Sequence, residues 1–269
     1  MPDKLFSQSE LAQLYDPFDP DRGDLDAYLE ILEELGARSV LDVGCGTGTF
    51  ALMLAERGFA VTGLDPAKAS LDIAKSKPGA EKLHWVLGAA VATSVQQPVD
   101  AVTMTGNVAQ VFLSDEEWLV ALQACHRALR AGGYLIFEAR DPAANAWLGW
   151  NRDGTYRTAS VDGVGEIACW EEVTVVEWPC VTFQTTFVLP GDTTATSTST
   201  LRFRSRENIL EALREAEFNA TEVREAPDRP GLEFVFIARR RSAVANPWSA
   251  YPKLSWHSER SSRLYERSL

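Results

Sequence analysis

The alternation of apolar and polar positions over residues 37–145 predicts short strands separated by helices. Apolar runs too short for a helix alternate with stretches in which apolar residues recur every three or four positions. The predicted strands lie at Val40 and Leu41 and over 60–64, 83–87, 99–104 and 134–138. The predicted helices cover 50–55, 67–76 and 114–129, and the last begins with a capping-box pattern at Ser114 and Glu117. This order predicts a parallel sheet covered by helices on both faces.

The pattern changes after Pro142. From about residue 155 to 204 the apolar period becomes two, and turn signals at 162–163 and 190–192 divide this stretch into about four antiparallel strands. A helix capped by Ser205 and two strands near 220–224 and 233–238 follow. The expected fold class is therefore α/β: a seven-stranded, mostly parallel sheet with helices on both faces. An inserted antiparallel β meander is expected to cap its cleft.

Four parts of the chain follow from these patterns. Residues 1–36 are expected to form a helical lid, interrupted by a proline-containing break at 15–20. Residues 37–145 and 205–241 form the core, 146–204 the inserted cap, and 242–269 a C-terminal tail. The tail carries Trp248, Tyr251, Trp256 and Tyr265. Such aromatic residues leave two alternatives open, packing on the body or a second subunit, and disorder.

Composition limits the possible partners. The chain has 269 residues and a net charge of −12, with 38 acidic and 26 basic residues. Because phosphate binding needs clustered cations, this balance argues against a nucleic-acid substrate. The four cysteines and three histidines lack zinc-site spacing, so no metal is expected. No run of 18 apolar residues occurs, and we expect a cytoplasmic protein with no membrane partner, monomeric or homodimeric.

Residues 42–48 form a glycine-rich turn between the first strand and its helix. The turn reads Asp42-Val43-Gly44-Cys45-Gly46-Thr47-Gly48, and the next strand ends at Asp65. Glycines let the backbone pass close to a ligand, and the helix N-terminus offers free N–H groups. An acid at the end of the second strand can accept hydrogen bonds from a ribose diol. The pattern thus predicts a nucleoside-binding unit, and Cys45 fits it as a small residue rather than as a catalytic thiol.

The segments 41–48 and 62–66 resemble the S-adenosylmethionine-dependent methyltransferases of the Rossmann-like class I type. Within that family the later loops resemble the small-molecule, glycine/sarcosine N-methyltransferase branch. The resemblance implies a Rossmann-like fold, S-adenosyl-L-methionine as cofactor and a small-molecule acceptor. It also implies that Asp42 lies near the positive amino-acid end of the cofactor. The implied cofactor-binding residues are Tyr15, Asp42, Gly44, Cys45, Gly46, Thr47, Gly48, Asp65, Pro66, Ala89, Ala90 and Thr105.

One of these positions departs from the family pattern. The family often has an acid after the third strand, where it binds the adenine amino group, but this chain has Ala89. The backbone of Ala89 and the side chains of Leu87 or Ala90 are the remaining candidates for holding the ring. Tyr15 lies in the segment that commonly folds across the cofactor as a lid, and a packing role is the alternative.

On the acceptor side the resemblance points to Asn107, after the fourth strand, and Arg140, after the fifth. An Arg at the mouth of a cleft can bind a carboxylate through two parallel hydrogen bonds. A salt bridge from Arg140 to Asp141, Glu138 or an acid of the meander is the alternative, as is a plain turn role for Asn107. Methyl transfer can proceed by in-line positioning alone. Glu138 or Asp141 could accept a proton, but the sequence singles out no catalytic base.

The aromatic residues of the insert have two interpretations. Together with Trp147 and Trp150, the alternating Tyr156, Trp170, Phe183 and Phe187 could line an acceptor pocket or form the core of the meander. Three functions remain open. The leading one is a methyltransferase acting on an N or O nucleophile of a small molecule. The others are a nicotinamide-dependent oxidoreductase, disfavoured because position 49 is Thr instead of a third glycine, and a silent cofactor-binding module.

Overall fold

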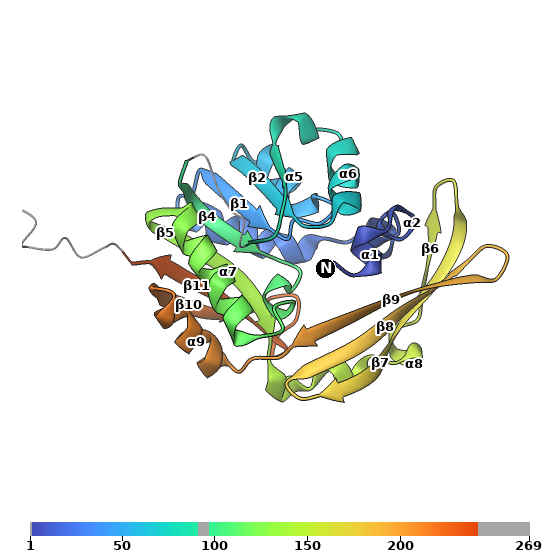
Figure 1. The fold of residues 1–269 in the computed structure, drawn as a ribbon. Helices are drawn as coiled ribbons and strands as arrows, with labels where there is room; N and C mark the ends of the chain where they lie inside the picture. Colours follow the sequence, from blue (N-terminus) through green and yellow to red (C-terminus); the bar gives the residue numbers. More distant parts are fainter. Residues whose placement is uncertain (1, 91–96, 242–269) are drawn as a thin grey trace, which may run out of the picture.

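The computed structural model describes residues 2–90 and 97–241, which form a seven-stranded sheet and a separate four-stranded sheet (Figure 1). The larger sheet has the order β10-β11-β5-β4-β1-β2-β3. Its strands are β1 (Ser39–Val43), β2 (Ala60–Asp65), β3 (His84–Leu87), β4 (Val99–Met104), β5 (Leu129–Arg140), β10 (Phe218–Glu225) and β11 (Glu233–Arg240). Neighbours from β3 to β5 are parallel, whereas β11 is antiparallel to both β5 and β10. The predicted fold class is confirmed.

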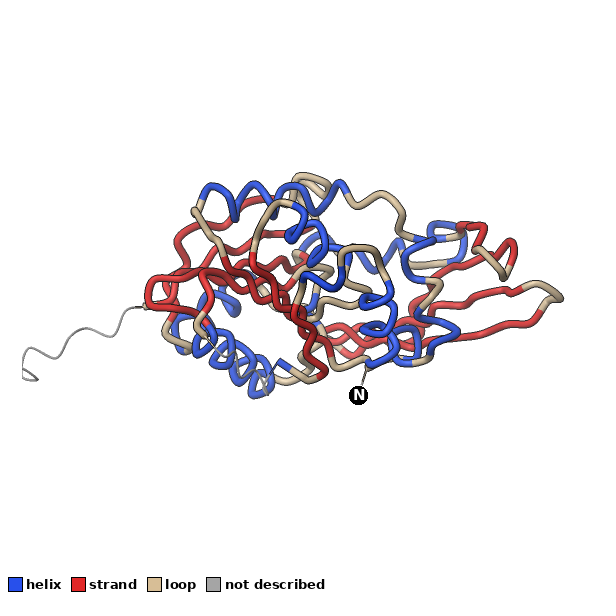
Figure 2. Tube along the Cα trace, turned by 90° about the horizontal axis from the view of Figure 1, so that it is seen from above, coloured by secondary structure: helices blue, strands red, loops and turns tan. Residues whose placement is uncertain are grey.

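Helices cover both faces of this sheet (Figure 2). Adjacent strand residues alternate between the faces, so Val40 and Ala101 pack against α4 (Asp26–Glu34) and α5 (Thr49–Glu56). Leu41 and Val102 face the other way, toward α7 (Asp115–Ala128) and α9 (Arg206–Glu215). α6 (Lys68–Ser76) packs against β2 and β3. The predicted capping box is present, since Glu117 N donates to Ser114 Oγ at 3.1 Å and Glu117 Oε2 accepts from Ser114 N.

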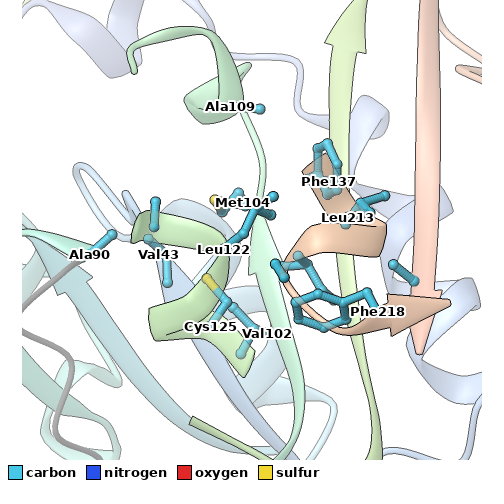
Figure 3. Packing of buried hydrophobic residues seen from close by; sticks show 14 of the residues in the cluster. Val43, Ala90, Val102, Met104, Ala109, Leu122, Cys125, Phe137, Leu213 and Phe218 are labelled. Carbon is cyan, nitrogen blue, oxygen red and sulfur yellow. The ribbon is translucent and has the colours of Figure 1, made fainter. Parts of the chain in front are cut away.

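The core beneath α7 and α9 is dense and aromatic (Figure 3). Phe137 of β5 stacks on Phe236 of β11 with ring centroids 5.1 Å apart, and Trp118 meets Phe137 edge-on at 5.4 Å. These contacts join the parallel part of the sheet to its antiparallel edge. Burial on this scale stabilises the fold by about 25 cal/mol per Å² of apolar surface. It therefore fixes the register that brings the end of β5 beside the start of β11.

The four-stranded sheet, which we call the cap, follows directly after β5. Its strands are β6 (Arg157–Val161), β7 (Gly165–Glu177), β8 (Cys180–Leu189) and β9 (Thr193–Arg202), paired antiparallel in chain order. Short helical turns precede it at η5 (Pro142–Ala144), η6 (Ala146–Gly149) and α8 (Arg152–Thr155). Other short turns are η2 (Ala80–Lys82) and η4 (Val108–Gln110). The threonine-rich stretch 193–200 is part of β9, because threonine favours extended strands.

The N-terminal segment, α1 (Lys4–Ser7), α2 (Ser9–Ala12) and α3 (Tyr15–Phe18), lies between the core and the cap (Figure 1). Its apolar side chains pack with the cap, because Leu11 and Leu14 share a cluster with Ile167 and Phe187. Toward the core its contacts are polar, and Ser70 Oγ of α6 donates to Phe6 O at 2.9 Å. The segment is therefore joined to the cap by apolar burial as well as hydrogen bonds, and to the core by polar contacts.

Two expectations for this end of the chain need correction. The predicted break at 15–20 contains α3, because proline at the third position of a helix needs no intrahelical donor. The chain then passes through η1 (Gly23–Leu25) into α4, whose Leu29 and Leu32 are buried in the core. Of residues 1–36, only the part before α4 can cover a site. The two alternatives for the tail, packing and disorder, concern residues 242–269, which lie outside the described residues.

None of the helices within residues 2–90 and 97–241 combines the length and apolar character needed to cross a membrane.

Candidate functional site

The glycine loop, residues 44–48, connects β1 to α5 in a conformation that requires its glycines. Gly44, Gly46 and Gly48 have φ angles of 74°, 53° and 81°. A Cβ on Gly44 would lie 2.4 Å from Val108 Cγ2, and one on Gly48 would lie 2.7 Å from Trp85 Cη2. A Cβ on Gly46 would have no atom within 4 Å. Two glycines thus permit close packing, while Gly46 borders open space that a ligand can enter.

Asp65 at the end of β2 holds this loop in place. One carboxylate oxygen accepts from Gly46 N at 2.8 Å, and the other accepts from Ala67 N at 2.7 Å. The side chain is buried, and burial raises its pKa although the two backbone hydrogen bonds lower it. A carboxylate offers about four acceptor positions, so Asp65 retains capacity for further donors. Pro66 beside it is exposed.

Asp42 lies at the other side of the loop, within β1. Only 1% of its surface is exposed, and its Oδ1 accepts from Thr103 Oγ1 at 2.8 Å. Its Oδ2 is buried and has no hydrogen-bond partner among the described residues. Burial raises the pKa of Asp42 to about 7. An orphaned buried carboxylate oxygen is costly unless a ligand supplies a donor, and a cation satisfies it best.

The loop after β3 gives an apolar surface next to Asp65. Leu87 pairs with Asp65 in the β2–β3 register, and Gly88 N donates to Asp65 O at 3.0 Å. Leu87 is 55% exposed and Ala89 is exposed, whereas Ala90 is buried in the core. Of the three residues considered for holding the adenine ring, Leu87 and Ala89 therefore present surface beside the carboxylate, and Ala90 does not. Thr105, after β4, is half-buried.

The N-terminal segment contacts the glycine loop through a residue that the sequence did not reveal. Asp16 Oδ1 accepts from Thr47 Oγ1 at 2.6 Å, and Asp16 Oδ2 pairs with Lys77 Nζ at 2.7 Å. Tyr15 is half-buried against Phe6, with ring centroids 5.7 Å apart, and burial raises its pKa. The sequence does not predict this contact, because Asp16 is 31 residues from Thr47 and belongs to no motif.

Asn107 and Arg140, the two predicted acceptor-side residues, meet at Glu233. Arg140 pairs with Glu233 across β5 and β11, and its Nε lies 3.4 Å from Glu233 Oε1. Asn107 Nδ2 lies 3.5 Å from both oxygens of the same carboxylate. The salt-bridge alternative is thus correct for Arg140, but the partner is Glu233 instead of Asp141, Glu138 or an acid of the cap. The sequence indicates Glu233 only as the first residue of a predicted final strand, and the pairing of that strand with β5 comes from the structure.

Further groups hold Arg140 in position. Its Nη1 donates to Gln110 Oε1 at 3.0 Å, and its guanidinium lies over the Trp150 ring at 5.3 Å from the centroid. Burial lowers its pKa, although Glu233 opposes this. Arg229 also reaches Glu233, with Nη1 2.8 Å from Oε1. Arg140 is therefore fixed on three sides, and Glu233 is shared between two guanidinium groups.

Glu138 and Asp141, the two candidate proton acceptors, are in different environments. Glu138 is 4% exposed, and its Oε1 accepts a short hydrogen bond from Asn107 N. Its Oε2 is buried without a partner among the described residues. Burial raises the pKa of Glu138 to about 7, although hydrogen bonding from Asn107 N and the Tyr28 hydroxyl lowers it. Asp141 instead caps η5, accepting from Ala143 N at 2.9 Å. The structure thus separates a buried, incompletely satisfied carboxylate from a structural cap.

The aromatic residues of the insert mostly form the interior of the cap. Trp147 and Phe203 pack edge-on at 4.6 Å in a buried cluster with Val181, and Trp150 meets Phe183 at 5.0 Å. Phe187 packs with the N-terminal segment. The self-packing alternative is therefore right for these residues. Trp150 also supports Arg140, while Tyr156 stacks on Trp170 at 6.4 Å and is 52% exposed.

Two other kinds of chemistry are relevant to the site, a reactive cysteine thiol and a bound metal ion. Burial raises the pKa of the Cys45 thiol far above its usual value, so Cys45 is protonated at neutral pH. Among residues 2–90 and 97–241, no group of three or more His, Cys, Asp or Glu side chains is placed to hold a metal ion.

Comparison with known proteins agrees with this arrangement. Residues 40–133, which contain the glycine loop, Asp65 and Asn107, match the family model of a methyltransferase domain. A cypemycin N-terminal methyltransferase of Streptomyces sp is 33% identical over 44% of this chain and 48% of its own length. A ubiquinone biosynthesis O-methyltransferase of Idiomarina loihiensis is 30% identical over 46% of this chain and 55% of its own length. The chain thus spans about half the length of these curated relatives.

The solved structures extend the likeness to nearly the whole fold. A sugar N-methyltransferase from Streptoalloteichus sp ATCC 53650 superposes with a TM-score of 0.69, covering 85% of this chain and 93% of its own. At 21% sequence identity this likeness shows the fold alone. The methyltransferase-domain match and the shared fold lead to one conclusion. Residues 40–133 carry a methyltransferase domain, and the chain as described has the fold of the Rossmann-like, class I S-adenosylmethionine-dependent methyltransferases.

Proposed function

We propose that this chain transfers a methyl group from S-adenosyl-L-methionine to a nitrogen or oxygen nucleophile of a small molecule. The observation that carries the proposal is the pair of buried carboxylates on either side of the open Gly46. Asp65 would accept the ribose hydroxyls, and Asp42, with its orphaned Oδ2, would face the ammonium of the amino-acid end. Leu87 and Ala89 would contact the adenine, taking the place of the missing acid.

When bound, the cofactor supplies a methyl group on an electrophilic sulfonium. The protein's own contribution is to position the nucleophile in line and to exclude water. The N-terminal segment contacts the glycine loop through Asp16 and the cap through Leu5 N, which donates to Ser197 Oγ at 2.9 Å. These contacts support a covered site, and a covered site suits a small acceptor better than a macromolecule. The net charge of −12 also disfavours nucleic acid.

The names of the similar proteins support both nitrogen and oxygen as the methylated atom. Of the two curated relatives, one transfers methyl groups to an N-terminus and the other to oxygen, according to their names, while the sugar enzyme is an N-methyltransferase. Both atoms therefore stay within the proposal. A cytoplasmic location and a monomeric or homodimeric state also stay predictions.

Calorimetric titration tests the cofactor. We expect S-adenosylmethionine and S-adenosylhomocysteine to bind with micromolar affinity and NAD not to bind. Binding of NAD alone would support the oxidoreductase instead. Incubating the protein with methyl-labelled donor and matched amines, phenols and carboxylates then tests transfer. Donor binding without any labelled product across that panel would favour the silent module.

A further inference from the structure

Two orphaned acceptor oxygens lie together at the ends of β4 and β5. Glu138 Oε2 and Asn107 Oδ1 are both buried without a hydrogen-bond partner among the described residues, in side chains exposed by only 4% and 6%. The Tyr28 hydroxyl of α4 also faces the Glu138 carboxylate and helps to lower its pKa. A hydrogen bond links Glu138 and Asn107, since the backbone N–H of Asn107 donates to Glu138 Oε1. An unsatisfied buried acceptor costs about 1–3 kcal/mol. A ligand that donates N–H groups would satisfy both oxygens at once.

The orientation of the Asn107 amide is set by its neighbour. Its Nδ2 lies 3.5 Å from the Glu233 carboxylate, so its Oδ1 is left for another partner. Exchanging the two amide atoms would bring an oxygen against that carboxylate, which is unfavourable. The unpaired atom is therefore Asn107 Oδ1, a hydrogen-bond acceptor, and a ligand that binds it must supply a donor.

The neighbouring cations are already paired. Arg140 lies against Glu233 and donates to Gln110, and Arg229 reaches the same Glu233 oxygen. A carboxylate ligand would have to compete with Glu233 for these guanidinium groups. It would also be repelled by the Glu138 carboxylate and would offer no donor to Asn107 Oδ1. Ammonium and amine groups face no such conflict. The local chemistry thus favours a nitrogen that carries hydrogens.

The position also suits transfer. In the sheet β1, β4 and β5 are consecutive neighbours, so Glu138 of β5 is separated from Asp42 of β1 by one strand. Its charge is close enough to Asp42 to contribute to raising the pKa of that carboxyl. Burial also brings the pKa of Glu138 itself to about 7, where a carboxylate accepts a proton more readily than in water.

We propose that Glu138 and Asn107 bind the amino group of a primary or secondary amine acceptor, and that Glu138 takes a proton from it. This rests on the proposed methyltransferase function. The nitrogen lone pair forms the N–C bond to the methyl carbon, and the electrons of the C–S bond go to sulfur, which becomes a neutral thioether. The methylated nitrogen, now positively charged, gives a proton to the Glu138 carboxylate, and the N–H bonding pair returns to nitrogen.

Small fragments bound to the S-adenosylhomocysteine complex provide the test. Methylammonium, tetramethylammonium and acetate are titrated separately at constant ionic strength, pH 8, and followed by NMR. We expect methylammonium to bind at millimolar concentration. Tetramethylammonium, a cation without N–H donors, should bind at least about fivefold more weakly, and acetate should not bind. Stronger binding of acetate, equal binding of both cations, or no methylammonium binding would each overturn the proposal.

Variants locate the fragment. Glu138→Gln should weaken methylammonium at least about tenfold while S-adenosylhomocysteine still binds. Asp141→Asn, which removes a nearby carboxylate with a capping role, should change methylammonium binding less than twofold; the reverse ranking would contradict the assignment. If Glu138→Gln does not fold, the wild-type comparison of the three fragments still decides. Failure of S-adenosylhomocysteine to bind would instead refute the proposed function, so the two failures are distinguishable.

Discussion

The cofactor side of the proposed site comes from one stretch of chain, whereas the acceptor side is assembled from distant ones. Asp42, the glycine loop and Asp65 lie within two strands and one turn. On the acceptor side, Glu138 meets Asn107 across 31 residues, and Asn107 meets Glu233 across 126. The first side is set by backbone geometry that local sequence specifies. The second depends on the register of β4, β5 and β11.

Both sides contain buried oxygens without a partner among the described residues, since Asp42 Oδ2 lies on the cofactor side, but only the cofactor side has an acid with both oxygens hydrogen-bonded. Asp65 holds two backbone N–H groups and needs no ligand to be stable. Glu138 and Asn107 each keep an orphaned oxygen. The glycine loop and Asp65 are therefore formed in advance, and changes there should affect folding and cofactor binding together. Changes on the acceptor side should affect the acceptor alone.

The largest effect is expected from Asp65→Ala. It removes both the proposed acceptor for the ribose hydroxyls and the anchor of Gly46 N and Ala67 N. Each lost hydrogen bond to a charged group is worth about 1.5–3 kcal/mol, so S-adenosylhomocysteine should bind at least ~100-fold more weakly by calorimetry. Asp72→Ala, on the exposed face of α6, is the control and should bind normally. Retained affinity in Asp65→Ala would refute the proposed ribose contact.

The second largest effect is expected from Gly44→Ala, which should lower the free energy of unfolding. Both Gly44 and Gly46 have positive φ, so alanine at either costs about 1–2 kcal/mol in strain. At position 44 the new Cβ also collides with Val108, adding about 1–3 kcal/mol. Urea unfolding of the ligand-free protein should therefore rank Gly44→Ala as less stable than Gly46→Ala. Adding Val108→Ala should recover part of the loss, and equal stability of the two single variants would contradict the packing role.

Asp16→Asn should have a moderate effect, confined to cofactor retention. The carboxylate joins Thr47 and Lys77 to the N-terminal segment, and it is partly exposed. We expect S-adenosylhomocysteine to bind about tenfold more weakly, mainly through faster dissociation measured by stopped flow. Asp19→Asn changes a more exposed acid of the same segment, paired with Arg22, and should dissociate normally. Equal rates for the two variants would mean that Asp16 does not hold the segment closed.

The smallest effect concerns protons. Burial raises the pKa of Asp42 to about 7, so the folded protein holds a proton that the unfolded chain loses above pH 4. This group's contribution to stability therefore falls as pH rises from about 4 to about 7, and is constant above that. A ligand ammonium facing Asp42 lowers its pKa, so binding should release a fraction of a proton at pH 6.5 and almost none at pH 8.5.

Calorimetry of S-adenosylhomocysteine in buffers with different ionisation enthalpies measures this release. Asp42→Asn should remove most of it. Glu138, whose pKa is also about 7, provides the comparison between the two sides. If Glu138→Gln removes the release and Asp42→Asn does not, the cofactor ammonium faces the acceptor side instead.

Much of the architecture could be predicted because it is specified by short-range patterns. The alternation of strands and helices, the Ser114 capping box and the change to period two after Pro142 each depend on neighbouring residues. The break expected at 15–20 was placed too early, since residues 15–18 form α3 and the chain leaves the helix at 19–22, because proline tolerance depends on its position in the helical turn. The role of α4 in the core was missed because an amphipathic helix does not indicate what it packs against.

The sequence by itself determined the sheet, the glycine loop and the acid that follows it, since backbone conformation and local spacing specify these features. Only the tertiary structure decided that Arg140 is paired with Glu233, that Asp16 reaches Thr47, and that Glu138 and Asn107 keep orphaned oxygens. The physical reason is that these contacts arise where strands of opposite direction and a distant helix converge. Side-chain partners at such points are set by register and packing, which no local pattern contains.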